Sequence, residues 1–175
     1  MPRVALTDLF GLPDILSGDA FYFLMPGIPG TNGNLRNLAL KCLNVQIPGV
    51  SNEKMTVPLH SHQINFRGRR IQPQSLSVTF YEDQLLQSFM ILKGWHEYVV
   101  GTKSGNSQAF KAGYAITATC DVYNHLGVSI DTITYYNLFP SEVPDITMDG
   151  SSSTPVQISV TLSYDYTDSL LNPST

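Results

Sequence analysis

Residues 156–166 read V-Q-I-S-V-T-L-S-Y-D-Y, and apolar and polar side chains alternate along the whole stretch. The apolar positions are Val156, Ile158, Val160, Leu162, Tyr164 and Tyr166. Successive side chains of a β-strand point to opposite faces, so this stretch predicts a strand with one face on an apolar core. The other face is expected to meet water or a polar neighbour, and residues 170–175 to form a frayed end. The chain is therefore predicted to build a half-exposed sheet.

Other stretches predict further strands on either side of Gly- and Pro-containing turns. Pro58 lies in the middle of one of them and removes a hydrogen-bond donor, which predicts an edge or bulged strand, or one that is completed by another chain. The Gly- and Pro-rich stretch 25–34 predicts a turn, and 102–108 and 140–155 predict loops. The expected strands are residues 21–24, 36–45, a hairpin within 53–66, 76–80, and a second hairpin formed by 115–123 and 128–139.

One stretch predicts a helix, from about residue 83 to residue 100. Glu82 and Asp83 stand at its start, where acidic side chains favour the helix dipole and cap the first turn. The predicted apolar stripe, at spacings of four and three, is Leu85, Phe89, Leu92, His96 and Val99. Strands, one helix and then more strands, without a βαβ repeat, indicate a mainly β or α+β domain.

Composition bounds the class of protein. The 175 residues are 42% hydrophobic and 14% charged, which fits one globular domain, expected over residues 19–168, that buries a core without disulfides. The low charge favours extensive subunit interfaces. No secretion signal or membrane segment is predicted, and synthesis in a reducing cytoplasm is expected. Cys42 and Cys120 are read as small hydrophobic residues, with pairing left as an alternative.

The N-terminal residues 1–18 are predicted to form an arm. Their apolar side chains, among them Leu6, Leu9 and Phe10, follow no sustained period. Such a segment is expected to pack on something outside its own sheet, such as a neighbouring subunit.

Charge is distributed unevenly along the chain. All ten Lys and Arg residues lie between Arg3 and Lys111, whereas residues 112–175 contain seven acidic residues and no basic one. This acidic part has two interpretations: a solvated face, or a surface that repels nucleic acid so that DNA slides past without sticking.

No residue pattern supports catalysis or a cofactor, and none is predicted. His60 and His62 have a spacing that could hold a metal only if a third ligand converged, so no metal site is expected. An enzyme that uses these histidines with an acid remains a rival hypothesis. A carbohydrate-binding β-sandwich is another, but it needs exposed aromatic residues, and Trp95 falls in the helix. The guanidinium groups of the basic cluster Arg67, Arg69 and Arg70 could meet phosphates. Because no aromatic residues are interleaved with them and the domain is not basic overall, the cluster is instead read as an interface that pairs with acids of an adjacent subunit.

The order of several motifs resembles the tail tube proteins of contractile-tailed phages, a family that also resembles the tube proteins of pyocins and of type VI secretion. The resemblance covers residues 19–168. The motifs that carry it are Lys41-Cys42 followed by Ile47-Pro48-Gly49, the segment 64–68 (INFRG), 76–83 (LSVTFYED) leading into the helix, 135–141 (YYNLFPS), 145–149 (DITMD) and 160–166 (VTLSYDY).

The resemblance implies a two-sheet antiparallel β-barrel or sandwich flanked by one helix. It implies homo-hexameric rings, stacked into a hollow virion tail tube inside a contractile sheath and assembled in the host bacterial cytoplasm. Implied partners are the sheath protein, baseplate, tail terminator and a tape-measure protein in the lumen, with DNA passing through without specific binding. A tube of an injection or secretion device remains the alternative.

Particular residues are assigned to these expected surfaces. The expected subunit interface is Met55, Val57, Leu59, Ile64, Phe66, Arg67, Arg69 and Arg70. The expected acidic lumen residues are Asp121, Asp131 and Asp165.

Overall fold

The computed structural model describes residues 16–31, 35–60, 62–101, 110–148, 151 and 154–169. The elements in this part of the chain are β1 (Phe21–Leu24), α2 (Leu35–Leu40), β2 (Cys42–Val45), β3 (Ser51–Leu59), β4 (His62–Ile71), β5 (Ser75–Tyr81), α3 (Gln87–Val99), the short 3-10 helix η1 (Lys111–Gly113), β6 (Ile116–Tyr123), β7 (Ser129–Glu142), β8 (Gln157–Ser163) and β9 (Tyr166–Ser169). Most of the expected N-terminal arm (residues 1–15), the predicted loop 102–108 and the expected frayed end 170–175 lie outside the described residues.

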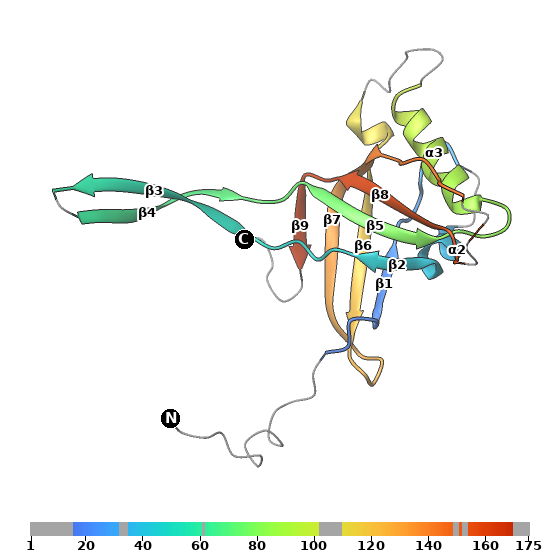
Figure 1. Cartoon of the computed structure of the whole chain (residues 1–175), viewed down its shortest axis with the longest axis horizontal. Helices are drawn as coiled ribbons and strands as arrows, with labels where there is room; N and C mark the ends of the chain where they lie inside the picture. Colours follow the sequence, from blue (N-terminus) through green and yellow to red (C-terminus); the bar gives the residue numbers. More distant parts are fainter. Residues whose placement is uncertain are drawn as a thin grey trace.

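Seven strands form one antiparallel sheet in the order β1-β6-β7-β8-β5-β2, with β9 paired to β7. The long strand β7 changes neighbours along its length, because residues 133–136 pair with β9 and residues 139–142 pair with β8. Strands β2, β5 and β8 run across β1, β6, β7 and β9 in Figure 1, so the sheet folds over on itself. β3 and β4 form a separate two-stranded sheet.

The core lies between the two halves of the folded sheet, and α3 covers it. Phe23, Cys120 and Tyr135 come from one half and are fully buried with Val78 and Val160 from the other. Trp95 of α3 is also fully buried, and its Nε1 donates a hydrogen bond of 2.9 Å to the carbonyl of Tyr114. The mainly β fold with two sheets is therefore confirmed.

The expected barrel does not close. β1 pairs only with β6 and β2 only with β5, so the two end strands of the seven-stranded sheet each keep one edge without a partner among the described residues. The alternation quoted for residues 156–166 is observed for Ile158, Val160, Leu162 and Tyr164, which are all buried.

That stretch is two strands and not one, which corrects the prediction. The chain bends at Tyr164 and Asp165, so Tyr166 begins β9 and is exposed. Asn137 fixes the bend from β7, because its Nδ2 donates a 2.7 Å hydrogen bond to Asp165 Oδ2. Asn137 has a φ of 57°, a left-handed conformation that Asn tolerates better than most residues.

The strand predicted for residues 36–45 is also wrong in its first half. Residues Leu35–Leu40 form the helix α2, and only Cys42–Val45 is a strand. The sequence L-R-N-L-A-L is rich in strong helix formers, and Leu38 and Ala39 are neighbours that are both buried, which alternation does not allow.

The helix α3 begins at Gln87, four residues after the predicted start. Leu86 precedes it with a φ of 54°, and the acidic residues act from outside the helix. Glu82 accepts hydrogen bonds from the backbone N–H groups of Ser88 (3.0 Å) and Phe89 (2.8 Å), and Asp83 accepts one from Gln87 (3.0 Å). The buried stripe contains Leu92 and Val99 as expected, but Ile91 and Trp95 in place of Phe89 and His96.

Candidate subunit interface

The hairpin of residues 51–71, formed by β3 and β4, projects away from the rest of the protein (Figure 1). Its strands pair so that Met55 lies opposite Phe66, Val57 opposite Ile64 and Leu59 opposite His62. Opposed residues of an antiparallel pair share a face. The five apolar residues that were predicted to form an interface therefore gather on one face of the hairpin.

This apolar face is exposed. The exposed fractions are 55% for Met55, 47% for Phe66, 47% for Leu59 and 43% for Ile64, while Val57 is half-buried. Among the described residues, the hairpin supplies none to the buried hydrophobic core. A contiguous exposed apolar face on a two-stranded ribbon is a typical feature of a protein interaction site.

The opposite face of the hairpin is polar and cationic. Lys54 lies opposite Arg67 and Asn52 opposite Arg70, and all are exposed. Residues 51–71 contain Lys54, Arg67, Arg69 and Arg70 against Glu53 alone, so four cations and one acid give +3 with the histidines neutral. The predicted arginines therefore do not share the apolar face: Arg67 and Arg70 lie behind it, and Arg69 lies in an irregular segment next to Gly68.

Gly68 marks a bulge in this face. The strand register shifts between Asn52 and Lys54, directly across from it. A Cβ on Gly68 would lie 2.8 Å from the carbonyl oxygen of Glu53, which is closer than side chains approach a backbone. The bulge therefore requires glycine, and such bulges increase the twist of a ribbon.

The three aspartates predicted for a lumen do not lie on one face. Asp121 is opposite Thr132 on the outer face of β6 and β7 and accepts a 2.6 Å hydrogen bond from Thr132 Oγ1. Asp131 is opposite the buried Val122, on the other face, and accepts a 2.7 Å hydrogen bond from Ser169 Oγ. A flat wall made from this sheet can include only one of the two.

Asp165 lies in the bend between β8 and β9. It forms a 2.5 Å ion pair with Lys111 and accepts the hydrogen bond from Asn137. The hydrogen bond from Lys111, followed by that from Asn137, holds the pKa of Asp165 below its usual value. This aspartate clamps the bend, and its lumen role stays a prediction.

The outer face of β1, β6, β7 and β9 carries a further acid that was not predicted. Asp168 lies opposite Thr134, which lies opposite Thr119, so Asp168 shares the face of Asp121. Tyr136 and Tyr166 stack on the same face with their ring centroids 4.5 Å apart. The bend at Asp165 interrupts the alternation, which is why the sequence pattern did not place Asp168 with Asp121.

The outer face of β5 and β8 has a different chemistry. Its cross-strand pairs are Ser75 with Ser163, Ser77 with Thr161, Thr79 with Ser159 and Tyr81 with Gln157. The hydroxyl oxygens of Thr79 and Ser159 are 2.9 Å apart and share a hydrogen bond. This pair of strands therefore presents a neutral, hydroxyl-rich surface.

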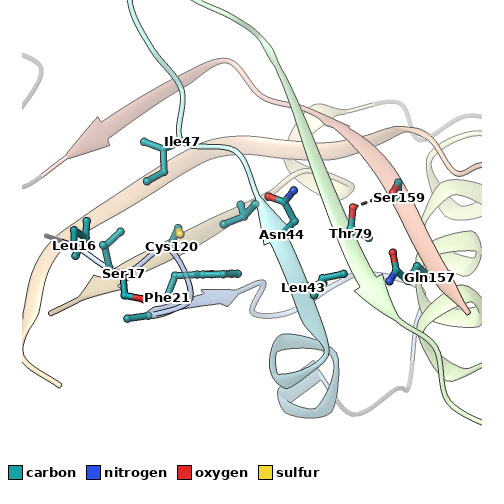
Figure 2. Close-up of a pocket in the computed structure, with 14 residues that line it drawn as sticks. Leu16, Ser17, Phe21, Leu43, Asn44, Ile47, Thr79, Cys120, Gln157 and Ser159 are labelled. Atoms are coloured by element: carbon teal, nitrogen blue, oxygen red, sulfur yellow. Dashed lines mark hydrogen bonds between the residues drawn. The ribbon is translucent and has the colours of Figure 1, made fainter. Parts of the chain in front are cut away.

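A hollow of about 470 Å³ lies at the open side of the sheet, between β1 and β2 (Figure 2). Leu16, Phe21, Leu43 and Ile47 line one part of it, and polar residues such as Thr79 and Ser159 line the other. No charged residue lines it among the described residues. Uncharged hollows beside open strand edges suit contacts with extended polypeptide.

The rival hypotheses depend on His60 and His62 for an enzyme and on exposed aromatic residues for a carbohydrate-binding module. His60 and His62 are exposed at the hairpin tip, and no group of three or more His, Cys, Asp or Glu gathers among the described residues. Trp95 is buried and offers no surface to a sugar.

Cys42 and Cys120 are free, and burial raises the pKa of their thiols to about 12 and about 11. No helix in the described part of the chain is long and apolar enough to span a membrane.

The fold is similar to the folds of several proteins from contractile injection systems. A sheath/tube terminator of an extracellular contractile injection system aligns with a TM-score of 0.64 at 12% identity over 91% of this chain and 99% of that one. The tube-terminating cap of the anti-feeding prophage gives 0.61 at 10% identity over 91% and 93%. A chain of a sheath–tube complex gives 0.57 at 11% identity over 96% and 98%.

The family follows from the sequence itself. The model of the phage tail tube protein family matches residues 21–167, which is most of the chain. The chain belongs to this family of structural tube proteins. No match was found among curated protein sequences.

Proposed function

We propose that this tail tube protein assembles as six-membered rings that stack into a hollow conduit for DNA inside a contractile sheath. In this role the chain carries out no catalysis. The sheath protein, baseplate, tail terminator and a tape-measure protein are its partners, and its place is the virion tail after assembly in the host cytoplasm.

The hairpin is the observation that carries this proposal. It exposes Met55, Leu59, Ile64 and Phe66 on one face, yet it packs against nothing in the described part of its own chain along most of its length. A second copy of the chain is the partner that every subunit of a homopolymer meets. Burying this face between subunits removes apolar area from water at about 25 cal/mol per Å².

The outer face of β1, β6, β7 and β9 is a better candidate for the wall of the conduit than the neutral outer face of β5 and β8. It carries Asp121 and Asp168 and, in the described residues of these strands, no Lys or Arg. A negative wall repels the phosphates of DNA and lets it slide. In this arrangement Asp131 lies on the other face of the sheet, and Asp165 lies in the bend between β8 and β9, where it pairs with Lys111.

Electron microscopy of the purified protein over a concentration series tests the proposal. We expect hollow rings with six-fold symmetry or stacked tubes. The double variant Met55→Ser with Phe66→Ser should remain folded but fail to form them. Met90→Ser is the control, because Met90 is also an exposed apolar residue but lies on α3. Wild-type protein that stays monomeric at every concentration would contradict the proposal, as would normal assembly by the double variant.

A tube from an injection device is the second candidate, because the structural neighbours quoted above come from such devices. The two candidates share the same subunit. They differ in the cargo, so nuclease-protected DNA in particles purified from the native host supports the phage tail, and particles without nucleic acid support the device.

A further inference from the structure

The root of the hairpin, where β3 and β4 join the body, is held by a hydrogen bond on each side. Tyr135 Oη of β7 donates a hydrogen bond of 3.1 Å to the carbonyl of Gln46, in the segment that leads into β3. On the other side, Gln72 Nε2 donates one of 2.9 Å to Thr167 Oγ1 of β9. The root is therefore attached to the body at β7 and β9.

A hollow of about 230 Å³ remains between the root and these two strands. This is several times the roughly 30 Å³ that one water molecule occupies in the liquid. The segment between β2 and β3 passes β9 there (Figure 1), and its apolar residues Ile47 and Val50 are 59% and 63% exposed. The root lines the hollow with Ile47, Pro48 and Val50, and the body lines it with Ile133, Thr167 and Ser169.

The side chains of β9 that face the hollow are two residues apart. Thr167 and Ser169 both line it, as alternation along a strand requires. The next residue of the chain on this face is Leu171, which can reach about 7 Å beyond Ser169 at roughly 3.3 Å per residue. By the same alternation, Leu170 belongs to the opposite face, that of Asp168.

β7 offers an edge along which β9 can continue. The described part of β9 ends opposite Ile133, whereas β7 begins four residues earlier in the sequence. Among the described strands, Thr132 pairs with β6 alone. Continuing the register of β7 and β9 places Leu170 opposite Thr132 and Leu171 opposite Asp131.

We propose that Leu170 and Leu171 extend β9 along β7, and that the side chain of Leu171 fills the hollow at the root of the hairpin. Leu171 then covers Ile47 and Val50 and removes their apolar surface from water. Pro173 ends the extension, because proline has no N–H group for the ladder. The C-terminal residues thereby add a third contact between root and body, which fixes the direction of the hairpin.

The occupant of the hollow is the same chain and not a second copy. One residue separates Leu171 from Ser169, which already lines the hollow, so the local concentration of Leu171 there exceeds that of any other chain. Arg70 and Asp131 also line the hollow, and their charges cancel, which suits an uncharged side chain. The inference concerns the fold of one subunit and goes beyond the proposed function, so it holds whether or not subunits assemble.

Leu171→Ser tests the inference, and Leu170→Ser is its matched control. In urea denaturation of the unassembled subunit, Leu171→Ser should lower the equilibrium constant of folding by about tenfold or more, because it leaves the hollow unfilled. Leu170→Ser should leave the midpoint at the wild-type value. Leu171→Met should also keep it, since methionine is apolar and of similar volume. An unchanged midpoint for Leu171→Ser, or equal losses in the two serine variants, would overturn the inference.

Hydrogen exchange of the wild-type protein tests the extension without any substitution. At least one amide within residues 170–172 should exchange about tenfold or more slowly than in an unfolded peptide. Unfolded rates at all of them would overturn the extension. Protection that disappears on dilution would mean that a second copy supplies the segment, which overturns the contact within one chain. Protection in a subunit that forms no rings would leave the inference standing and overturn the proposed function alone.

Discussion

Glu82 is a single residue on which the start of α3 depends. Its two carboxylate oxygens accept hydrogen bonds from the backbone N–H groups of Ser88 and Phe89, which have no acceptor within the first turn of the helix. Because Ser88 is buried, these N–H donors would have little access to water if the Glu82 carboxylate were absent. Glu82 thus acts as a cap from six and seven residues away, where a capping residue usually stands two or three residues before its donors.

Replacing Glu82 by Ala should lower the free energy of unfolding by about 1–3 kcal/mol, because it leaves buried N–H groups without acceptors. Urea denaturation followed by circular dichroism measures this loss. Gln84→Ala is the control, since Gln84 is exposed in the same turn and should change stability by less than about 0.5 kcal/mol. Equal losses in both variants would show that the turn as a whole, and not the cap, is responsible.

Asp165 makes the stability of the bend depend on pH. Its pKa in the folded protein is lowered, chiefly by the hydrogen bond from Lys111, from an ordinary value of 3.8. A carboxyl with a lowered folded pKa stabilises the protein above its unfolded pKa, and this contribution is lost as the pH falls through the folded value.

We therefore expect wild-type protein to lose part of its stability as the pH drops below about 4, and the variant Asp165→Asn to lose less over the same range. Thermal melting between about pH 7 and pH 3 measures the difference. At neutral pH the variant should be the less stable of the two. Parallel pH curves for both proteins would remove Asp165 as a source of the acid sensitivity.

At the scale of elements, the bulge at Gly68 controls the shape of the hairpin. A methyl group there would meet the carbonyl of Glu53 at 2.8 Å, so the two strands must separate or change register. Gly68→Ala should leave the unfolding midpoint of the body nearly unchanged, because the described residues of the hairpin supply nothing to the core. It should impair assembly, which sedimentation velocity measures.

Asn65→Ala, on the regular part of the same strand, is the control for Gly68→Ala. It removes the hydrogen bond that Asn65 accepts from Thr56 but does not crowd the backbone. Assembly of Gly68→Ala at the wild-type level would show that the twist of the hairpin does not matter for the interface.

Sequence patterns predicted the elements in which side-chain alternation decides the structure. The strands β5, β6 and β8 have alternating faces. β5 and β6 were placed within one residue at each end, and β8 begins within one residue of its predicted start but ends three residues before its predicted end. The hairpin was predicted from two apolar runs around His60 and His62, and its pairing follows that spacing. The mainly β class could be predicted from the sequence alone, because the alternation of apolar and polar residues is regular in the strands that supply most of the core.

The errors occur where contacts distant in sequence override the local pattern. The break at Asp165 depends on Lys111 and Asn137, which are 54 and 28 residues away. The late start of α3 depends on side chains that cap it from a preceding turn. For the predicted interface, residue types identified the apolar residues, but the pairing across the hairpin was needed to show that Arg67 lies on the opposite face.

At the scale of the whole molecule, the hairpin and the body are separable. Ser51 and Ile71 are cross-strand partners, so the two ends of the hairpin lie side by side on the body. Replacing residues 51–71 by a short Gly-Ser-Gly connection should leave a folded body whose free energy of unfolding is within about 1 kcal/mol of wild type. The same protein should not form rings or tubes in electron micrographs.

A circular dichroism spectrum and a cooperative urea transition provide the control for this deletion, since they report the body alone. Loss of the cooperative transition would show that the hairpin is needed for folding. Tubes formed by the shortened protein would place the interface elsewhere, with the hollow between β1 and β2 as the next surface to test.

The separation of hairpin and body has a consequence for how such proteins diversify. Substitutions in the hairpin are not filtered by the demand for a stable core, because none of its described residues is buried there. In the proposed assembly they are filtered only by the surface they meet on another copy. Related proteins can therefore change residues of the hairpin together with the residues that the hairpin contacts on another copy, while the body stays constant. After a few such paired changes, two tube proteins with the same fold can lose the ability to copolymerise.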